Sequence, residues 1–243
     1  MKKLTILFMF IWVTPVLAGD IEFQSTYTQQ MFKDFSKEVG AAVIYRGVAP
    51  GHPLGLTGFD IGVEGTFTKI HDNQDYWKKA VKGGDPSAYL VAPKLHAQKG
   101  LPWGFDVGLA VGKIVDTDIA YAGGEVRYSI LQGGILEPNL AVRGSYSQTF
   151  GADQLDFKTY GLDISASKGF GAVIKIVPYA GIGQYWMESR PKNLAAGIHL
   201  GNETLSKTRF FGGAQLQMTL FTVTAEVDYI EVPSLSLRAG VTW

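Results

Sequence analysis

The last ten residues of the chain, 234–243, alternate between apolar and polar side chains. Leu235, Leu237, Ala239, Val241 and Trp243 share one face, and polar or small residues occupy the other. A period of two is that of a β-strand. An apolar face that ends on an aromatic residue, opposite a polar face, is typical of a strand in a membrane β-barrel.

The same alternation recurs along most of the chain, and turn residues such as Pro50-Gly51-His52-Pro53 separate the repeats. Most of the repeats are long enough to cross a hydrocarbon layer when tilted, which takes about 9–11 residues. The pattern predicts eleven strand-like segments, at about 39–48, 58–70, 89–99, 103–114, 118–130, 138–149, 157–168, 173–187, 205–218, 221–230 and 234–243.

The composition of the two faces favours a barrel over a two-sheet sandwich. In residues 103–113 the apolar face begins with Trp103 and Phe105, whereas the opposite face is mostly glycine and alanine. The outward face of a soluble sandwich would be polar and well charged. Small residues instead suit the crowded interior of a barrel, and the long apolar faces suit contact with lipid.

The number of strands has two solutions, because bacterial single-chain barrels have an even number. Either residues 21–27 add a first strand, or one of the eleven segments lies outside the wall. We therefore expect a closed antiparallel up-and-down transmembrane β-barrel of about 12 strands, with 10 as the alternative. Counting back from a periplasmic C-terminus puts the long loops, 71–88 and 188–204, outside and the short turns, 99–103, 169–172 and 219–221, inside.

The N-terminal region has a different pattern. A basic start and a short apolar run that ends at Ala18 predict a secretory signal peptide over residues 1–18. Met31, Phe32, Phe35 and Val39 then recur at helical spacing, which predicts a short amphipathic helix over 28–38. This helical segment, residues 19–38, is either a plug in the barrel or a periplasmic cap, and the barrel is expected to occupy residues 39–243.

Composition excludes several classes of function. The chain has no cysteine, so it holds no disulfide and no thiolate metal site. It carries 22 basic and 22 acidic residues; loss of Lys2 and Lys3 with the leader leaves 20 basic residues and a net charge of −2, which gives no support for nucleic-acid binding. Its four histidines are not paired at a metal-binding spacing, so we expect no metal and no cofactor.

Enzymatic activity is not expected either. The sequence has no G-x-S-x-G motif to mark a nucleophile. The most suitable candidate for a catalytic base is His71, beside Asp72 and Asp75, although a solvated loop histidine explains the same residues.

The leader, the absence of cysteine, the period-two repeat and the terminal Trp243 together resemble bacterial outer-membrane β-barrel proteins over about residues 39–243. Leu237, Val241 and Trp243 resemble the C-terminal signal that the barrel assembly machinery reads. The runs 53–60 and 93–96 are similar to an uncharacterised family of predicted outer-membrane proteins. The resemblance implies a Gram-negative outer-membrane location, with the lipid of that membrane and the assembly machinery as partners, and it leaves the oligomeric state open.

Charged residues on the small, polar faces are expected to point into the lumen. Seven acids and seven bases lie on these faces, with one histidine beside them: Asp60, Glu64, Asp106, Glu125, Asp163, Glu226 and Asp228; Arg46, Lys94, Arg127, Arg143, Lys175, Arg209 and Arg238; and His96. A balanced set indicates pairing, because unpaired buried charges cost several kcal/mol each.

Two functions follow from these charges. A narrow, charge-lined channel or carrier for small solutes is the first hypothesis. A non-conducting structural or adhesive barrel, closed by the ionic network, is the second, and an outer-membrane barrel enzyme is a distant third.

Overall fold

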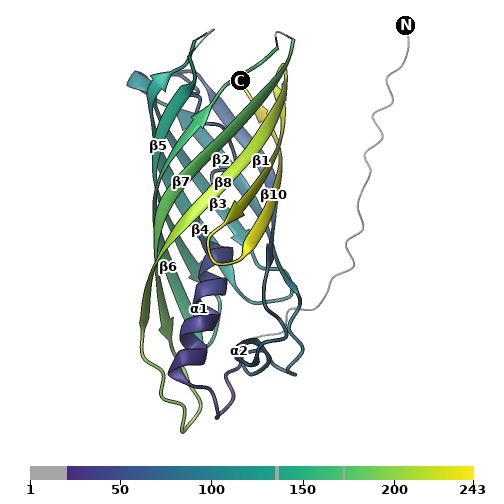
Figure 1. The fold of residues 1–243 in the computed structure, drawn as a ribbon, viewed down its shortest axis with the longest axis vertical. Coiled ribbons are helices and arrows are strands. Elements are labelled where there is room, and N and C mark those ends of the chain that lie inside the picture. Colours follow the sequence, from purple (N-terminus) through teal and green to yellow (C-terminus); the bar gives the residue numbers. More distant parts are fainter. Residues whose placement is uncertain (1–20, 135–136, 172) are drawn as a thin grey trace, which may run out of the picture.

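The computed structural model describes residues 21–134, 137–171 and 173–243. The predicted signal peptide lies outside the described residues. The described chain forms one closed barrel with a helix at one end (Figure 1).

Ten antiparallel strands form the wall of the barrel. Each pairs with its neighbour in sequence, and β1 pairs with β10 to close the sheet. The strands are β1 (Phe59–Lys69), β2 (Tyr89–Gly100), β3 (Phe105–Lys113), β4 (Ala120–Gln132), β5 (Asn139–Phe150), β6 (Leu155–Ser167), β7 (Ile174–Pro191), β8 (Glu203–Met218), β9 (Phe221–Tyr229) and β10 (Pro233–Thr242). The predicted fold class is confirmed; the expectation of twelve strands was wrong, and the alternative of ten is correct.

The strand predicted at 39–48 does not exist. Residues 39–43 end helix α1 (Gln29–Val43), and the chain then runs inside the barrel without regular secondary structure to Gly51. It leaves the interior and turns at the exposed residues 55–57 before β1 begins at Phe59. Glycines and prolines at 47–53 weaken a strand and remove ladder donors, which explains why this stretch does not join the wall. Ile21 makes only an isolated bridge to Val81, so residues 21–27 add no strand either.

Helix α1 is five residues longer at its C-terminal end than the predicted helix. Thr28 caps its start, accepting a hydrogen bond from the backbone N–H of Met31 at 3.3 Å. In this additional part of the helix, Gly40 packs closely against β7, because an added Cβ would meet the sulfur of Met187 at 2.6 Å. Its apolar face is buried, which lets it pack inside the barrel mouth.

The wall is apolar outside and polar inside. In β9 the side chains alternate strictly between exposed and buried, and the exposed Val227 retains 61% of its accessible surface. The exposed Leu109 of β3 retains 71%, whereas the inward Glu226 retains 1%. This distribution is the inverse of that in a water-soluble protein. It fits an outer surface in contact with lipid.

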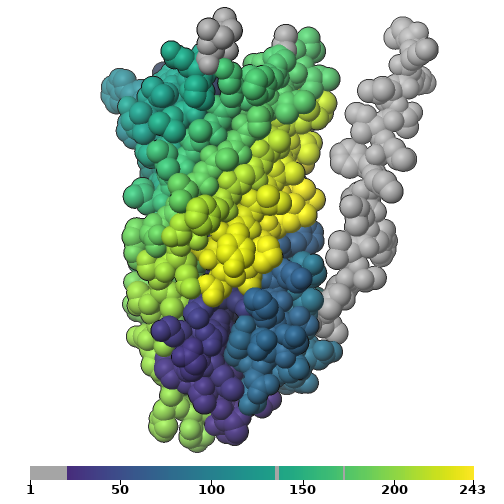
Figure 2. Space-filling view, viewed as in Figure 1, coloured from purple at the N-terminus to yellow at the C-terminus, as the bar shows by residue number. Residues whose placement is uncertain are grey.

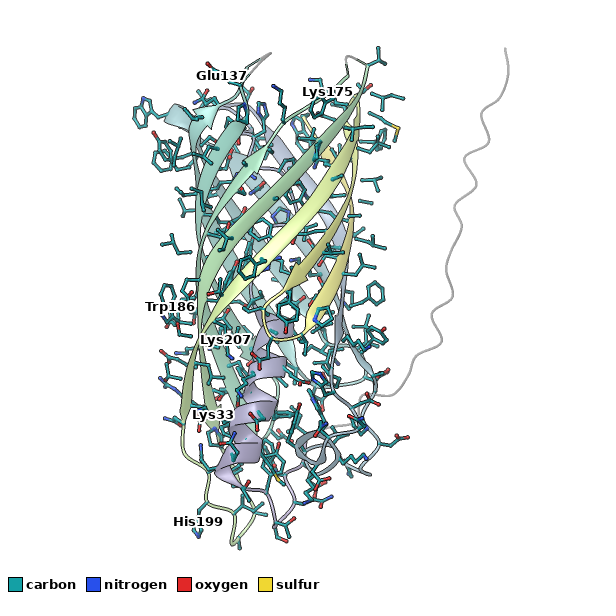
Figure 3. The ribbon with its side chains drawn as sticks, in the orientation of Figure 1. Lys33, Glu137, Lys175, Trp186, His199 and Lys207 are labelled. Carbon is teal, nitrogen blue, oxygen red and sulfur yellow. The ribbon has the colours of Figure 1, made fainter. Side chains whose placement is uncertain are left out.

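The two ends of the barrel differ (Figures 1 and 3). The C-terminus and the turns at 101–104, 168–171 and 219–220 lie at one end, here named the turn end, where Figure 3 labels Glu137 and Lys175. Helix α1, the short helix α2 (Asp75–Lys78) and the connections 70–88 and 192–202 lie at the other, named the loop end, where Lys33 and His199 are labelled. Figure 2 shows α1 packed beside the 70–88 connection at the loop end. Of the helices in the described residues, none has the length and apolarity needed to cross a bilayer.

Candidate functional site

Residues 44–52, here named the lumen segment, run through the interior of the barrel. Ile44, Tyr45, Arg46 and Val48 each retain no more than 3% of their accessible surface. Gly47 lies so close to the wall that a Cβ there would collide with Arg143 and Glu125. The lumen segment therefore fills the middle of the barrel without a β-ladder of its own.

Wall side chains bind the backbone of the lumen segment and of the last residue of α1. Seven backbone carbonyls between Val43 and His52 accept hydrogen bonds from wall side chains, and Arg127 donates to two of them. A buried chain outside a β-ladder needs such side-chain donors to satisfy its carbonyls. The donors and acceptors are Ser147 to Val43 (2.8 Å), Lys94 to Arg46 (2.6 Å), Arg143 to Gly47 (2.7 Å), Arg238 to Val48 (3.2 Å), Arg127 to Pro50 (2.9 Å) and His52 (3.0 Å), and Ser129 to Gly51 (2.9 Å).

The same cations are paired with the buried carboxylates. The closest approaches are Lys94 to Glu64 (2.7 Å), Arg127 to Asp106 (2.9 Å), Arg143 to Asp163 (2.9 Å) and Glu125 (3.4 Å), Arg209 to Glu226 (2.5 Å) and Asp228 (3.2 Å), Arg46 to Asp228 (3.0 Å), and Arg238 to Asp60. Every predicted lumen acid thus has a basic partner. Each cation that also binds a carbonyl joins three parts: its own strand, an acid and the lumen segment.

The structure buries fourteen of the fifteen charged or histidine residues predicted to face the lumen. Arg46 belongs to the lumen segment instead of the wall, which corrects its predicted place on a strand. Lys175 is exposed, because it lies at the start of β7, beyond the lumen segment, on the rim of the turn end (Figure 3). His96 is buried, with Nδ1 at 3.7 Å from Asp60.

A cavity of about 420 Å³ opens at the turn end, and we name it the vestibule. Its floor is the end of the lumen segment, including Ala49 and Pro50. Amide and basic side chains line much of the remainder, among them Gln98, Gln132, Gln215, Gln217, Arg127, Lys168 and Lys175. The vestibule provides room for a small polar solute between this floor and the opening at the turn end.

The loop end is sealed by an apolar core. Phe32, Phe35 and Val39 of α1 pack with Ile114 and Leu155 and with other residues of the strand ends and loops. Water and solutes therefore meet apolar packing at this end and charged packing at the middle of the lumen.

One buried carboxylate fixes the loop-end seal. Glu38 of α1 retains 2% of its accessible surface and accepts hydrogen bonds from the Tyr76 hydroxyl at 2.6 Å and the Trp77 indole at 2.7 Å. His71 approaches the same carboxylate with Nδ1 at 2.6 Å, and its side chain is 59% exposed. Burial raises the pKa of the Tyr76 hydroxyl, and its hydrogen bond to Glu38 raises it further. The geometry gives His71 a role in holding the 70–88 connection onto α1.

The sequence did not reveal the carbonyl ligands or the tyrosines of the lumen. Tyr179 donates to Glu226 at 2.9 Å, and Tyr185 donates to Asp163 at 2.9 Å. Tyrosine suits either face of a barrel strand, so alternation did not single these out. The lumen segment spans the second half of the expected strand 39–48 and part of the expected turn 50–53, and its glycines and prolines are the sequence feature that distinguishes it from a wall strand.

The residues predicted as an assembly signal lie on the closing strand and beside it. Leu237 and Trp243 are exposed on the outer face, and Val241 is half-buried. Trp243 stacks on Phe59 with ring centroids 5.4 Å apart, and the two residues exchange backbone hydrogen bonds of 2.8 and 2.9 Å. Their role in assembly stays a prediction.

No protein-family model and no curated protein matches the chain. Solved structures similar to it include Ail, the attachment invasion locus protein of Yersinia pestis, at 15% identity, with 76% of this chain and 97% of that chain covered and a TM-score of 0.31. The outer membrane protein OprG from Pseudomonas aeruginosa is 11% identical, with coverages of 80% and 99% and a TM-score of 0.37. The translocator domain of the autotransporter NalP from Neisseria meningitidis is 10% identical, with coverages of 88% and 95% and a TM-score of 0.38.

The architecture itself defines the class. A single antiparallel sheet closed on itself, with a lipid-compatible outer face and a polar interior, is the design of outer-membrane β-barrels. Within the described residues, no three His, Asp or Glu side chains are grouped to hold a metal ion.

Proposed function

We propose that the protein is a non-conducting outer-membrane β-barrel, closed along its lumen by its own N-terminal region, with a structural or adhesive role at the membrane. The observation that carries this proposal is the anchoring of the backbone between Val43 and His52 by basic and serine side chains of the wall. A segment held at a single point could move aside while that point stays in place. This backbone is held by seven hydrogen bonds along ten residues, so it cannot move out of the lumen without breaking most of them at once.

Energetics support permanent closure. Removing the lumen segment takes away Arg46 from Asp228 and the carbonyl ligands from Lys94, Arg127, Arg143 and Arg238. Breaking one buried ion pair by removing a partner costs about 3–5 kcal/mol. The four carbonyl contacts are hydrogen bonds to charged donors, each of which contributes about 1.5–3 kcal/mol. Together with the ion pair, these losses are comparable with the ~5–15 kcal/mol that stabilises a typical folded domain.

Planar bilayer recordings test the proposal. Refolded mature protein should insert without conductance steps, whereas a variant that lacks residues 21–56 should open a water-filled lumen and conduct. Heat-modifiable gel migration of both proteins checks that each forms a closed barrel. Steady conductance by the intact protein would overturn the proposal, and Lys113→Ala, far from the lumen, serves as the matched control.

A second candidate function, a solute carrier whose lumen segment moves, is favoured by the vestibule of about 420 Å³. Gly51 and Ala141 offer a direct test, since a Cβ on Gly51 would lie 2.7 Å from that of Ala141. This is somewhat under the ~3.5–4.5 Å of a disulfide, so a small backbone shift would allow one. The chain has no other cysteine. Solute uptake into liposomes that stops when Gly51→Cys/Ala141→Cys is oxidised and resumes on reduction would establish the carrier; absence of uptake in both states would exclude it.

A further inference from the structure

A charged groove lies on the outer face of the barrel near the loop end. It has a volume of about 340 Å³ and is lined by side chains from β5, β6 and β7 and from the turns beside them. The lining contains three bases and two acids: Lys158, Arg190 and Lys192, and Asp156 and Glu188. The lumen and the vestibule take no part in it.

The strand register fixes the height of this groove relative to the membrane. Tyr146, Tyr160 and Trp186 are direct cross-strand neighbours on the outer face, and the two tyrosine rings lie 5.2 Å apart. Figure 3 labels Trp186 at this level of the barrel. Such an aromatic row marks the boundary between the hydrocarbon and the headgroups.

The groove begins one outward step beyond that row. Gln148, Lys158 and Glu188 are direct cross-strand neighbours, two residues further along each strand toward the loop end. Two residues span about 6.6 Å along a strand. The side chain of Lys158 therefore lies at headgroup level. The cross-strand pair Asp156 and Arg190 lies two residues further toward the loop end.

The charges in the groove are available to an external anion. Arg190 pairs with Glu188 at 3.2 Å and Lys192 with Asp156 at 2.8 Å, but all four side chains are between 32% and 54% exposed. Exposed pairs of this kind contribute little and rearrange easily. Lys158 has no hydrogen bond or ion pair with any residue in the described part of the chain. An arginine fork beside a lysine suits the oxygens of a phosphate group.

We propose that this groove binds a phosphate group of a membrane lipid headgroup, with Lys158 and Arg190 as the two ligands and the aromatic row packed against the acyl chains below. The lipid chemistry that fits best is a phosphorylated glycolipid, because Gln148, Asp156 and Glu188 add polar groups that can meet sugar hydroxyls around the phosphate. The groove thereby fixes both the depth of the barrel and one lipid on its surface.

Lipid retention tests the proposal. The full mature protein is placed in phosphatidylcholine nanodiscs that contain a small fraction of lipopolysaccharide, and the lipopolysaccharide retained per barrel after detergent washing is measured by native mass spectrometry. Lys158→Gln/Arg190→Gln should retain about thirtyfold less, since each of the two basic residues contributes on the order of 1 kcal/mol at a charged membrane surface and about 1.4 kcal/mol corresponds to a factor of ten. Lys33→Gln/Lys113→Gln removes the same charge from exposed sites outside the groove and should retain as much as the unmodified protein.

Two further arms identify the ligand chemistry. Lipopolysaccharide from which the phosphates have been removed should be retained weakly and equally by all three proteins. Inorganic phosphate should change the free energy of unfolding of the groove variant and of the unmodified protein by the same amount. Equal retention of intact lipopolysaccharide by the groove variant and the control, or a groove-dependent effect of inorganic phosphate alone, would overturn the assignment to lipid. Gel migration with and without heating confirms that each variant is folded.

Discussion

At the scale of single residues, Arg143 shows how the lumen is organised. Its guanidinium lies 2.9 Å from Asp163 on β6, 3.4 Å from Glu125 on β4 and 2.7 Å from the carbonyl of Gly47. The three partners come from two strands and the lumen segment. Arg143 therefore couples the register of the wall to the position of the chain inside it.

Replacing Arg143 with alanine should destabilise the barrel by about 3–5 kcal/mol, because two buried carboxylates lose their partner. Chemical unfolding in detergent, followed by tryptophan fluorescence, measures the change. Lys113→Ala removes an exposed cation that lies 3.9 Å from Asp118 and should change the free energy of unfolding by no more than about 1 kcal/mol. Equal, small effects for the two variants would mean that water solvates the lumen charges.

A glycine substitution tests the fit of the lumen segment independently of charge. Gly47→Ala places a methyl group against the Arg143 guanidinium and the Glu125 carboxylate, so it should destabilise by about 1–3 kcal/mol, as overpacking does in a full core. Gly144→Ala is the matched control, because nothing lies within 4 Å of its added Cβ. A neutral Gly47→Ala would show that the lumen segment is held loosely.

At the scale of elements, successive side chains of each strand point alternately to the lipid and to the lumen. Leu109 on β3 and Val227 on β9 are 71% and 61% exposed; Leu109 is the central residue of its strand, and Val227 lies two residues before the end of its own. Their immediate neighbours along the chain, Gly108 and Glu226, face inward. The register thus sets which substitutions meet hydrocarbon.

Leu109→Arg and Val227→Arg should each cost about 2–4 kcal/mol, the penalty for arginine at the midplane of a bilayer. Refolding into lipid vesicles at a series of denaturant concentrations measures this cost. Ala196→Arg, at an exposed site in the 192–202 connection, should be nearly neutral. A cost at Ala196 equal to that at Leu109 would contradict the assignment of the outer face.

The strands could be predicted because their pattern is local. Ten of the eleven expected segments are wall strands, and the residues that alternation placed on the inner face are buried wall residues, apart from Arg46 and Lys175. The segment 39–48 is not a strand because its first half, residues 39–43, ends helix α1, and only its second half lies in the lumen segment. The contact between Arg143 and Gly47 spans 96 positions, so no local pattern contains it. Which acid pairs with which base likewise depends on the register of the closed sheet.

At the scale of the whole molecule, the chain passes through its own barrel. Helix α1 starts at the loop end, the lumen segment crosses the interior, and β1 starts at the turn end beside Trp243 (Figure 1). Helix α1 and the C-terminus therefore lie at opposite ends of the barrel. A helix at the loop end fits the expected plug. It cannot be a periplasmic cap if the short turns and the C-terminus face the periplasm, as the asymmetry of loops in such barrels indicates.

Cysteine labelling of intact cells tests this topology, since the chain has no cysteine of its own. Lys33→Cys places a thiol on the exposed face of α1 at the loop end, and Lys175→Cys places one on the rim of the turn end (Figure 3). A membrane-impermeant maleimide should label Lys33→Cys in intact cells and Lys175→Cys only after the outer membrane is permeabilised. The reverse pattern would mean that the turn end faces outward.

Labelling of both would leave two explanations, passage of the reagent through the lumen or through other channels of the cell. A maleimide attached to a polymer too wide for either route separates them, because it should still reach Lys33→Cys and should never reach Lys175→Cys if the barrel is closed and oriented as the loops predict.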